Sequence, residues 1–399
     1  MLALVGKIAQ HPNSKYLIMP EAHQKGFALK FTLLLCSTLT VMVGATISPI
    51  LPKVQATFQQ IPYASILTKL VLTIPALFIG LGSPVAGYLL DQFGRIKLLG
   101  AAIVLFIIGG TSGYYVDSLY LILGGRIMVG IAVAGIMTTV TTLIGDYFEG
   151  QDRNKFMGLQ ASFMAYGGVV FISLSGFLAD INWRAPFLLF GIPVLYLPLV
   201  LTALYEPNIN KNKADQASNT STNYPKGFVF FIYTIAFFFM ACFYMIPTQL
   251  PFYLEKVVEV SSTEVGLAIA MATLSGGTTS LFYTRIKNRA TYNFIYFMIF
   301  LAMGIGFLVI SSSASYGIII AGLVICGFGM GMLMPNTNTC LLNLAPEHIR
   351  GRIMGGVTMS FFLGQFFSPI LFEPLYANFA ISSAYAIVAI LLLLLGIGF

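Results

Sequence analysis

Charged side chains are scarce in this chain of 399 residues. They make up 9% of it, whereas hydrophobic residues make up 57%. Soluble domains carry about 25% charged residues, so this chain could not cover its surface in water. The mean hydropathy of +0.87 excludes a disordered chain, a coiled coil, a secreted disulfide scaffold and a cytosolic enzyme. Long apolar runs, rather than short alternating strands, predict a membrane protein built of helices.

Cysteine and histidine are also rare, with four and three residues. No two cysteines have CxxC spacing, and all four lie in apolar segments, which favours small buried side chains over disulfides. The histidines lie apart from other ligand-type residues, so we expect no metal site. The sequence has no Walker loop and no nucleophile–base constellation. We therefore expect no cofactor, no ATP drive and no enzymatic activity.

Twelve apolar segments are long enough, or nearly so, to cross a bilayer. They predict an all-α membrane protein of twelve transmembrane helices in two six-helix halves, residues 27–205 and 227–399. A polar segment, residues 206–226, links the halves, and residues 1–26 form a cytoplasmic N-terminal segment. The predicted spans are Phe27–Leu51, Ser65–Leu90, Leu98–Val116, Leu119–Tyr147, Phe156–Ala179, Ala185–Tyr205, Gly227–Leu254, Val265–Tyr283, Tyr292–Ser312, Tyr316–Leu344, Ile353–Tyr376 and Ser383–Phe399.

The basic residues predict the orientation of these spans. With the N-terminus in the cytoplasm, only Lys53, Arg184 and Lys256 lie in outside segments, and Lys69 and Arg126 lie within spans. The other 16 of the 21 lysines and arginines lie in cytoplasmic segments. We therefore expect a multi-pass protein of the cell membrane, in a bacterium the inner membrane, with both termini in the cytoplasm. This topology explains the net charge of +7 without a nucleic-acid partner.

The two halves share a weak internal repeat. A shift of 197 residues superposes basic pairs, glycines and methionines without a gap, for example Gly130 on Gly327, Met137 on Met334, Arg153 on Arg350 and Gly158 on Gly355. The basic residue followed by Met-Gly lies in a predicted cytoplasmic turn, outside the apolar bias that produces chance matches. Two parallel repeats predict a secondary transporter whose binding site lies near the midplane between the halves.

Residues 87–97 read GYLLDQFGRIK and lie between the second and third spans. They resemble the signature loop of the major facilitator superfamily, G-x-x-x-D-R-x-G-R-[RK]. Gln92 and Ile96 depart from that pattern, and four residues match it: Gly87, Asp91, Gly94 and Arg95. The resemblance implies alternating access, with this loop as a conformational latch on the cytoplasmic side.

Residues 126–130 read RIMVG in the fourth span and resemble the R-x-x-Q-G motif of the drug:proton antiporter branch. Arg126 lies about 10 Å deep, where a charge faces a cavity or a partner. We take it as a coupling or substrate residue; a structural pairing is the alternative. The antiporter signature of the fifth span is degraded, because Phe171-Ile172 replaces its Gly-Pro pair. This loss counts against export by antiport without excluding it.

Other polar residues within the spans are further candidates for substrate or coupling contacts. They are Gln249 in the seventh span and Asn336 and Asn338 in the tenth, and we add Met137, whose position repeats as Met334. The two asparagines are two residues apart, so at most one faces a cavity. Glu373 lies about one turn inside the outer end of the eleventh span and is our candidate proton site.

Together these features favour a secondary transporter that exports apolar or amphiphilic compounds in exchange for protons. Aromatic residues make up 14% of the chain and it has 17 methionines, which suits an adaptable apolar cavity. The alternative is a dedicated carrier of a polar metabolite, such as an organic acid, an amino acid or a siderophore, in either direction. The expected partners are a small-molecule substrate, protons and membrane lipid, and we expect a monomer.

Overall fold

The computed structural model describes residues 26–207, 225–346 and 349–399, which form helices and no strands. Because prolines interrupt several spans, some of the helices are segmented. The first half contains α2 (Phe27–Ala45), η1 (Ser48–Ile50), α3 (Leu51–Thr57), α4 (Ala64–Phe93), α5 (Arg95–Tyr115), α6 (Leu119–Tyr147), α7 (Gly150–Ile181), η2 (Ala185–Leu195) and α8 (Tyr196–Ala203).

The second half repeats this order after the linker. Its first span is again segmented, and its last helix is the shortest of the spans. It contains α9 (Lys226–Phe243), α10 (Met245–Tyr253), η4 (Leu254–Val258), α11 (Ser262–Lys287), α12 (Tyr292–Ser312), α13 (Tyr316–Leu344), α14 (Arg350–Asn378) and α15 (Ile381–Ile397). The fold is thus the predicted one, twelve transmembrane helices in two pseudo-symmetric halves.

Within the described residues, eleven helical segments are long and apolar enough to cross a membrane, and α15 adds a twelfth of 17 residues. Three predicted spans coincide with their helices: α6, α12 and α13. The predicted end of the first span was wrong. Leu51 is not its last residue, because helical structure resumes in α3 after the break at η1 and continues to Thr57.

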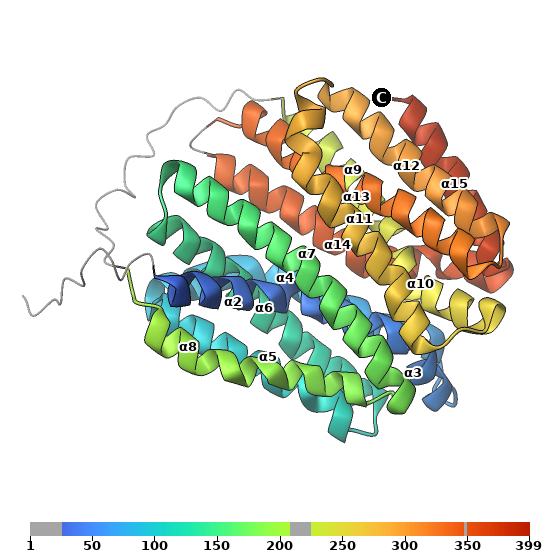
Figure 1. Ribbon diagram of the computed structural model, residues 1–399, viewed down its shortest axis with the longest axis horizontal. Helices are drawn as coiled ribbons and strands as arrows, with labels where there is room; N and C mark the ends of the chain where they lie inside the picture. Colours follow the sequence, from blue (N-terminus) through green and yellow to red (C-terminus); the bar gives the residue numbers. More distant parts are fainter. Residues whose placement is uncertain (1–25, 208–224, 347–348) are drawn as a thin grey trace, which may run out of the picture.

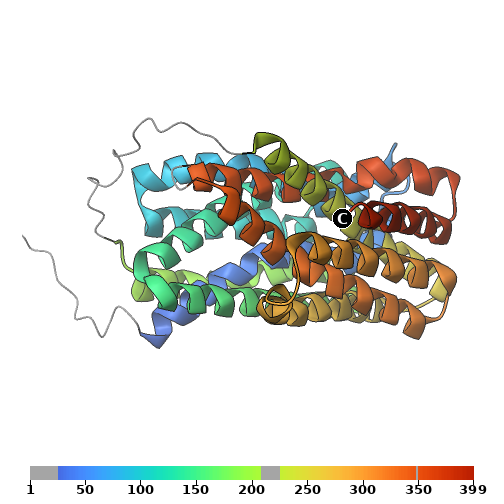
Figure 2. The ribbon, with the colours of Figure 1, turned by 90° about the horizontal axis from the view of Figure 1, so that it is seen from above.

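All the spans run roughly along one axis in both views (Figures 1 and 2). We call the end of the bundle at which α2 and α14 begin and α6 ends the terminal side; it lies on the left of Figure 1. The opposite end, where α3 and α7 end and α11 begins, is the distal side.

Each half has its own apolar core. One cluster of buried side chains is built almost wholly from α2 to α8, and the other from α9 to α15. Two residues cross over: Phe252 of α10 belongs to the first-half cluster, and Ile172 of α7 belongs to the second-half cluster. The halves meet along two helix pairs, α4 with α14 and α7 with α11. These pairs are equivalent under the repeat, since α4 corresponds to α11 and α7 to α14.

Glycines let helices α11 and α13 pack backbone to backbone inside the second half. A Cβ on Gly327 would collide with the carbonyl oxygen of Ala272, and one on Gly331 with that of Gly276. Small residues permit this approach, which provides van der Waals contact where the hydrophobic effect is absent. By contrast, no atom lies within 4 Å of the place where a Cβ on Gly317 would stand, in the same helix α13.

We predict that Gly331→Ala destabilises the folded protein, because the added methyl meets rigid backbone rather than a movable side chain. Overpacking of this kind costs about 1–3 kcal/mol. The midpoint of thermal unfolding in detergent should fall, whereas Gly317→Ala should leave it unchanged or raise it slightly, since alanine favours helix. Equal midpoints for Gly331→Ala and the unaltered protein would contradict the packing role of Gly331.

Candidate functional site

A hydrogen bond on the distal side joins the first and seventh spans, which belong to different halves. The Ser48 hydroxyl donates to the carbonyl oxygen of Pro247 at 2.7 Å. This carbonyl has no helical partner because Pro251, four residues on, lacks an N–H group. The segments ISPILP and IPTQLP, residues 47–52 and 246–251, both end in Leu-Pro, and the bond joins one to the other. It is one of the contacts between the halves on the distal side, which together we call the distal closure.

A buried ion pair lies beside it, between α4 and α14. The Nζ atom of Lys69 is 2.5 Å from Oε2 of Glu373, and the Ser65 hydroxyl donates to Oε1 at 2.8 Å. The side chain of Lys69 is 4% exposed and that of Glu373 is 27% exposed. Lys69 also lies over the rings of Phe252 and Tyr376, at 5.8 and 5.4 Å from their centroids.

Both charges of this pair lie five residues inside the distal ends of their helices, about 7.5 Å deep. The structure thus gives the predicted carboxylate, Glu373, a partner that sequence reasoning did not assign to it. The available signal was that Lys69 is the one lysine we placed within a span. Its pairing with a residue 304 positions away could not be read from the sequence.

Arg126 is fully buried inside the first half and bonds to backbone rather than to a carboxylate. Its Nε donates to the carbonyl of Val71 at 3.0 Å and its Nη2 to that of Val43 at 2.8 Å. Pro75 leaves the Val71 carbonyl without a helical donor, and the N–H of Ile47 bonds to Gly44 instead of Val43 where α2 ends. Arg126 therefore satisfies two carbonyls that helix breaks leave free.

The Arg126 guanidinium also contacts an aromatic ring, and one of its nitrogens has no partner within the described ranges. Its carbon lies 5.0 Å from the centroid of the Phe190 ring, in cation–π geometry. The Nη1 atom is buried and has no hydrogen-bond partner among the described residues. A guanidinium without a carboxylate is costly in a membrane, so these backbone bonds hold it in place. The geometry gives weight to the structural alternative for Arg126.

The remaining candidates lie on helices α6, α10 and α13. Asn336 is fully buried; its Oδ1 accepts from the Tyr283 hydroxyl at 3.2 Å, and its Nδ2 donates to the carbonyl of Tyr292 at 3.3 Å. Gln249 is 2% exposed, and its Nε2 is buried without a partner in the described part of the chain. Met137 and Asn338 are half-buried. None of the contacts above brings these four residues together.

The predicted latch residues lie on the terminal side. Gly94 has φ +85°, a conformation that favours glycine, and its missing side chain leaves room for the carboxylate of Glu206. That carboxylate accepts from the backbone N–H groups of Arg95 and Ile96 at 2.7 and 3.0 Å. Glu206 thus caps the N-terminus of α5, a role that the sequence analysis missed because it placed Glu206 in the linker.

Among the described residues, no hydrogen bond or ion pair joins the other latch residues to the second half. The side chain of Arg95 pairs with Asp146 of α6 at 3.4 Å, within the first half. Asp91 is exposed at the end of α4. At Gly87, no atom of the described residues outside the backbone of its own helix lies within 4 Å of the place where a Cβ would stand, so α4 makes no close helix contact there.

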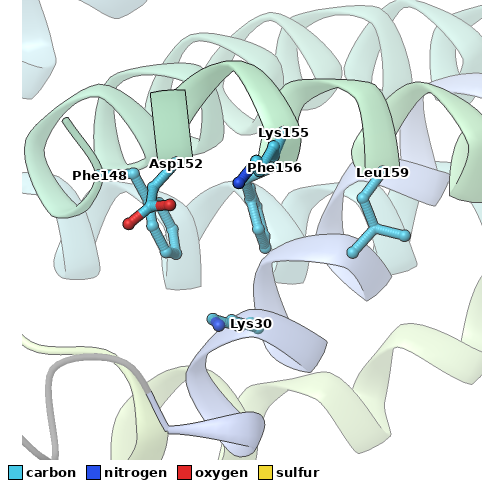
Figure 3. A pocket seen from close by; sticks show the side chains of 6 residues that line it. All are labelled: Lys30, Phe148, Asp152, Lys155, Phe156 and Leu159. Atoms are coloured by element: carbon cyan, nitrogen blue, oxygen red, sulfur yellow. The ribbon is translucent and has the colours of Figure 1, made fainter. Parts of the chain in front are cut away.

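Two surface pockets are formed within the first half. One, of about 230 Å³, lies on the terminal side between α2 and α7; Figure 3 shows Lys30 facing it from one helix and Lys155 from the other, with the stacked rings of Phe148 and Phe156 beside them. The other, of about 570 Å³, opens on the distal side beside Lys53, Asp180 and Trp183. Neither pocket lies between the halves, where a transport site is expected.

Residues 33–369 match the family model described as Major Facilitator Superfamily. The Bacillibactin exporter of Bacillus subtilis (strain 168) is 25% identical over 373 residues, which cover 87% of this chain and 90% of that protein. Multidrug resistance protein 1 of the same organism is 25% identical over 303 residues, 72% of this chain and 75% of that protein.

Solved structures share the fold. A bacterial homolog of the human lysosomal transporter Spinster superposes with a TM-score of 0.72 at 16% identity, covering 96% of both chains. A family match over most of the sequence thus agrees with twelve helices in repeated halves. The chain belongs to the major facilitator superfamily, and it is a secondary transporter rather than an enzyme.

Proposed function

We propose that this transporter exports small amphiphilic organic molecules in exchange for protons. The observation that carries the proposal is the Lys69–Glu373 pair, a half-buried carboxylate whose buried lysine partner belongs to the opposite half. The names of similar proteins, the Bacillibactin exporter and Multidrug resistance protein 1, support export as the direction. Similarity to the first over 90% of its length also favours the alternative, a dedicated carrier of one polar metabolite.

The orientation follows from the basic residues. Lysines and arginines concentrate on the terminal side, which we infer to be cytoplasmic, in a bacterium the cytoplasmic face of the inner membrane. Both termini then lie inside, with residues 1–26 and 206–226 as cytoplasmic segments. On this orientation the distal closure faces outward, and the conformation is closed to the outside.

Proton coupling follows from the position of the ion pair. Because Lys69 and Glu373 belong to different halves, opening of the distal side separates them. A lone carboxylate within a span is costly, so in this cycle Glu373 takes a proton from the outside when Lys69 leaves it. Closure brings the Lys69 ammonium back, and the proton leaves toward the cytoplasmic side. For a neutral solute, one charge crossing 100 mV supplies about 2.3 kcal/mol, enough for roughly fifty-fold accumulation.

The other candidate residues take separate roles in this proposal. Met137, Gln249 and Asn338 contact the solute, with the Gln249 amide as a neutral donor. Asn336, bonded to α11 and α12 within its own half, positions α13. Arg126 positions α2 and α4 at their breaks. The latch residues, Gly87, Asp91, Gly94 and Arg95, engage the second half when the cytoplasmic side closes.

We predict that Glu373→Gln abolishes proton movement without abolishing solute exchange. In proteoliposomes with a trapped pH dye and an imposed pH gradient, tetraphenylphosphonium should release protons through the unaltered protein. For Glu373→Gln the signal should fall to that of empty liposomes, while downhill exchange of labelled solute continues. Lys69→Met should behave alike, and the double variant should be no worse, because the two residues act as one unit.

Asp117→Asn is the matched control, since Asp117 is a distal carboxylate paired with Arg184 inside the first half. It should leave the proton signal intact. Full proton flux through Glu373→Gln would refute the coupling role. If the cation gives no signal but organic acids, amino acids or an iron-free siderophore do, the chain is instead a dedicated metabolite carrier.

For Arg126 we predict a loss of stability rather than of coupling. Arg126 reaches the Val43 and Val71 carbonyls from two different nitrogens of its planar fork, which a lysine lacks, and a hydrogen bond to a charged group contributes about 1.5–3 kcal/mol. Arg126→Lys should lower the thermal midpoint and Arg126→Ala should lower it further. The ratio of protons to solute moved by the folded fraction should stay constant. An unchanged midpoint with a changed ratio would show that Arg126 couples directly.

A further inference from the structure

Asp180, near the distal end of α7, bonds to the first residues of α11 in the other half. Its Oδ1 accepts from the backbone N–H of Ser262 at 3.0 Å, and its Oδ2 from that of Thr263 at 3.0 Å. The Thr263 hydroxyl donates to the same Oδ2 at 2.6 Å. Lys53 completes the set, 3.2 Å from Oδ1, and donates a further bond to the carbonyl of Ala179 at 2.8 Å.

These bonds complete the cap of α11. Ser261 is its N-cap, and Ser261 and Glu264 form a capping box, in which each side chain accepts from the backbone N–H of the other. The N–H of Val265 makes the first bond within the helix, to Ser261. The N–H groups of Ser262 and Thr263 remain, and Asp180 accepts from both. Half of this cap is therefore supplied by the opposite half of the protein.

The backbones are close enough for this only because glycines face each other at the interface. A Cβ on Gly176 would lie 2.5 Å from the carbonyl oxygen of Ser262, and one on Gly266 would lie 2.7 Å from that of Ile172. Asp180 stands one turn beyond Gly176 on α7. The carboxylate is thus placed against the positive end of the α11 dipole, where a negative charge is stabilising.

We propose that Asp180 is a positioning residue of transport: its carboxylate caps α11 across the two halves and sets how often the distal side opens. The proposal rests on the transport cycle proposed above. Because the bonds join different halves, they exist while the distal side is closed and are lost when it opens. Water then replaces Asp180 on both N–H groups, so the cap favours the closed conformation.

This contact differs from the Lys69–Glu373 pair in its lysine, because the two carboxylates are similarly exposed, at 33% for Asp180 and 27% for Glu373. Lys53 is 34% exposed, beside the pocket that opens on the distal side, whereas Lys69 is 4% exposed. Lys53 and Asp180 belong to the same half, so they stay paired when the halves separate and no proton is needed. Asp180 therefore adjusts the balance between conformations without taking part in proton coupling.

The test measures opening directly, through a cysteine that only opening exposes. Ile172 of α7 is 3% exposed and packs into the apolar cluster of the second half. We would introduce Ile172→Cys and follow its reaction with a membrane-impermeant maleimide added from outside. The native cysteines in the described residues are all buried, and the protein without Ile172→Cys gives their background rate. The labelling rate scales with the open population.

In this background Asp180→Ala should raise the labelling rate about five- to tenfold, the effect of losing a helix cap. Thr263→Val, which removes only the hydroxyl bond, should raise it less. Asp180→Glu, which retains the carboxylate, should fall between Asp180→Ala and the unaltered protein. Asp117→Asn, which removes a distal carboxylate paired within one half, should change nothing. Thermal unfolding of each variant shows that the protein measured is folded.

An unchanged labelling rate in folded Asp180→Ala and Thr263→Val would overturn the proposal. So would an equal increase with Asp117→Asn, because surface charge alone would then explain it. The assay uses no substrate and no pH gradient. If proton flux persists in Glu373→Gln but labelling is faster in Asp180→Ala, proton exchange through Glu373 is rejected and the role of Asp180 stands. If Glu373→Gln loses proton flux but labelling in Asp180→Ala is unchanged, only the role of Asp180 is rejected.

Discussion

The rest of this structure depends on one constraint: a backbone carbonyl inside a membrane must have a donor from the protein itself. Prolines and short helix breaks in the first, second and seventh spans leave carbonyls without their usual N–H partner. Side chains from other helices supply the missing donors. Arg126 donates to the carbonyls of Val43 and Val71, and Ser175 donates to that of Thr46 at 2.5 Å. These polar residues within the spans therefore stabilise the fold, whether or not they also act in transport.

The same kind of contact becomes mechanistic where it joins the two halves. Arg126 bonds to helices of its own half, so its bonds persist as the halves move. Ser48 reaches the free carbonyl of Pro247 in the other half, and Asp180 reaches the free N–H groups of α11. In the proposed cycle, those bonds are present while the distal side is closed and are lost when it opens. A backbone group left free at a helix end or break therefore has a structural role when its partner belongs to the same half, and a mechanistic role when its partner belongs to the other half.

The sequence predicted most of the fold because its signals are local. Apolar length placed the spans, and the bounds of α6, α12 and α13 agree with it to the residue. The extension of the first span to Thr57 was missed because the rule reads hydropathy, whereas Lys53 and Gln55 are polar yet helical. The site was predicted less completely. Glu373 could be predicted because it is a carboxylate within a span. The position of Lys69 within a span was visible too, but its pairing with Glu373 was not, and neither was the bonding of Asp180 to α11, because both contacts join residues far apart in the sequence.

The two charged contacts across the halves differ in what they allow on opening, and that difference follows from burial. Lys69 is 4% exposed, and the aromatic rings around it offer no water when Glu373 leaves. Separation of that pair leaves a lysine in apolar surroundings, which is costly. Under the proposed exchange, the proton that Glu373 takes on opening lets the gradient offset this cost. Asp180 keeps Lys53 of its own half beside it, and both side chains are about one-third exposed, so the loss of its bonds to α11 has a small cost. A transporter needs open and closed conformations of similar free energy. In the proposed cycle the distal side is closed by an ion pair that protonation breaks and by a weak helix cap, so neither contact holds it closed permanently.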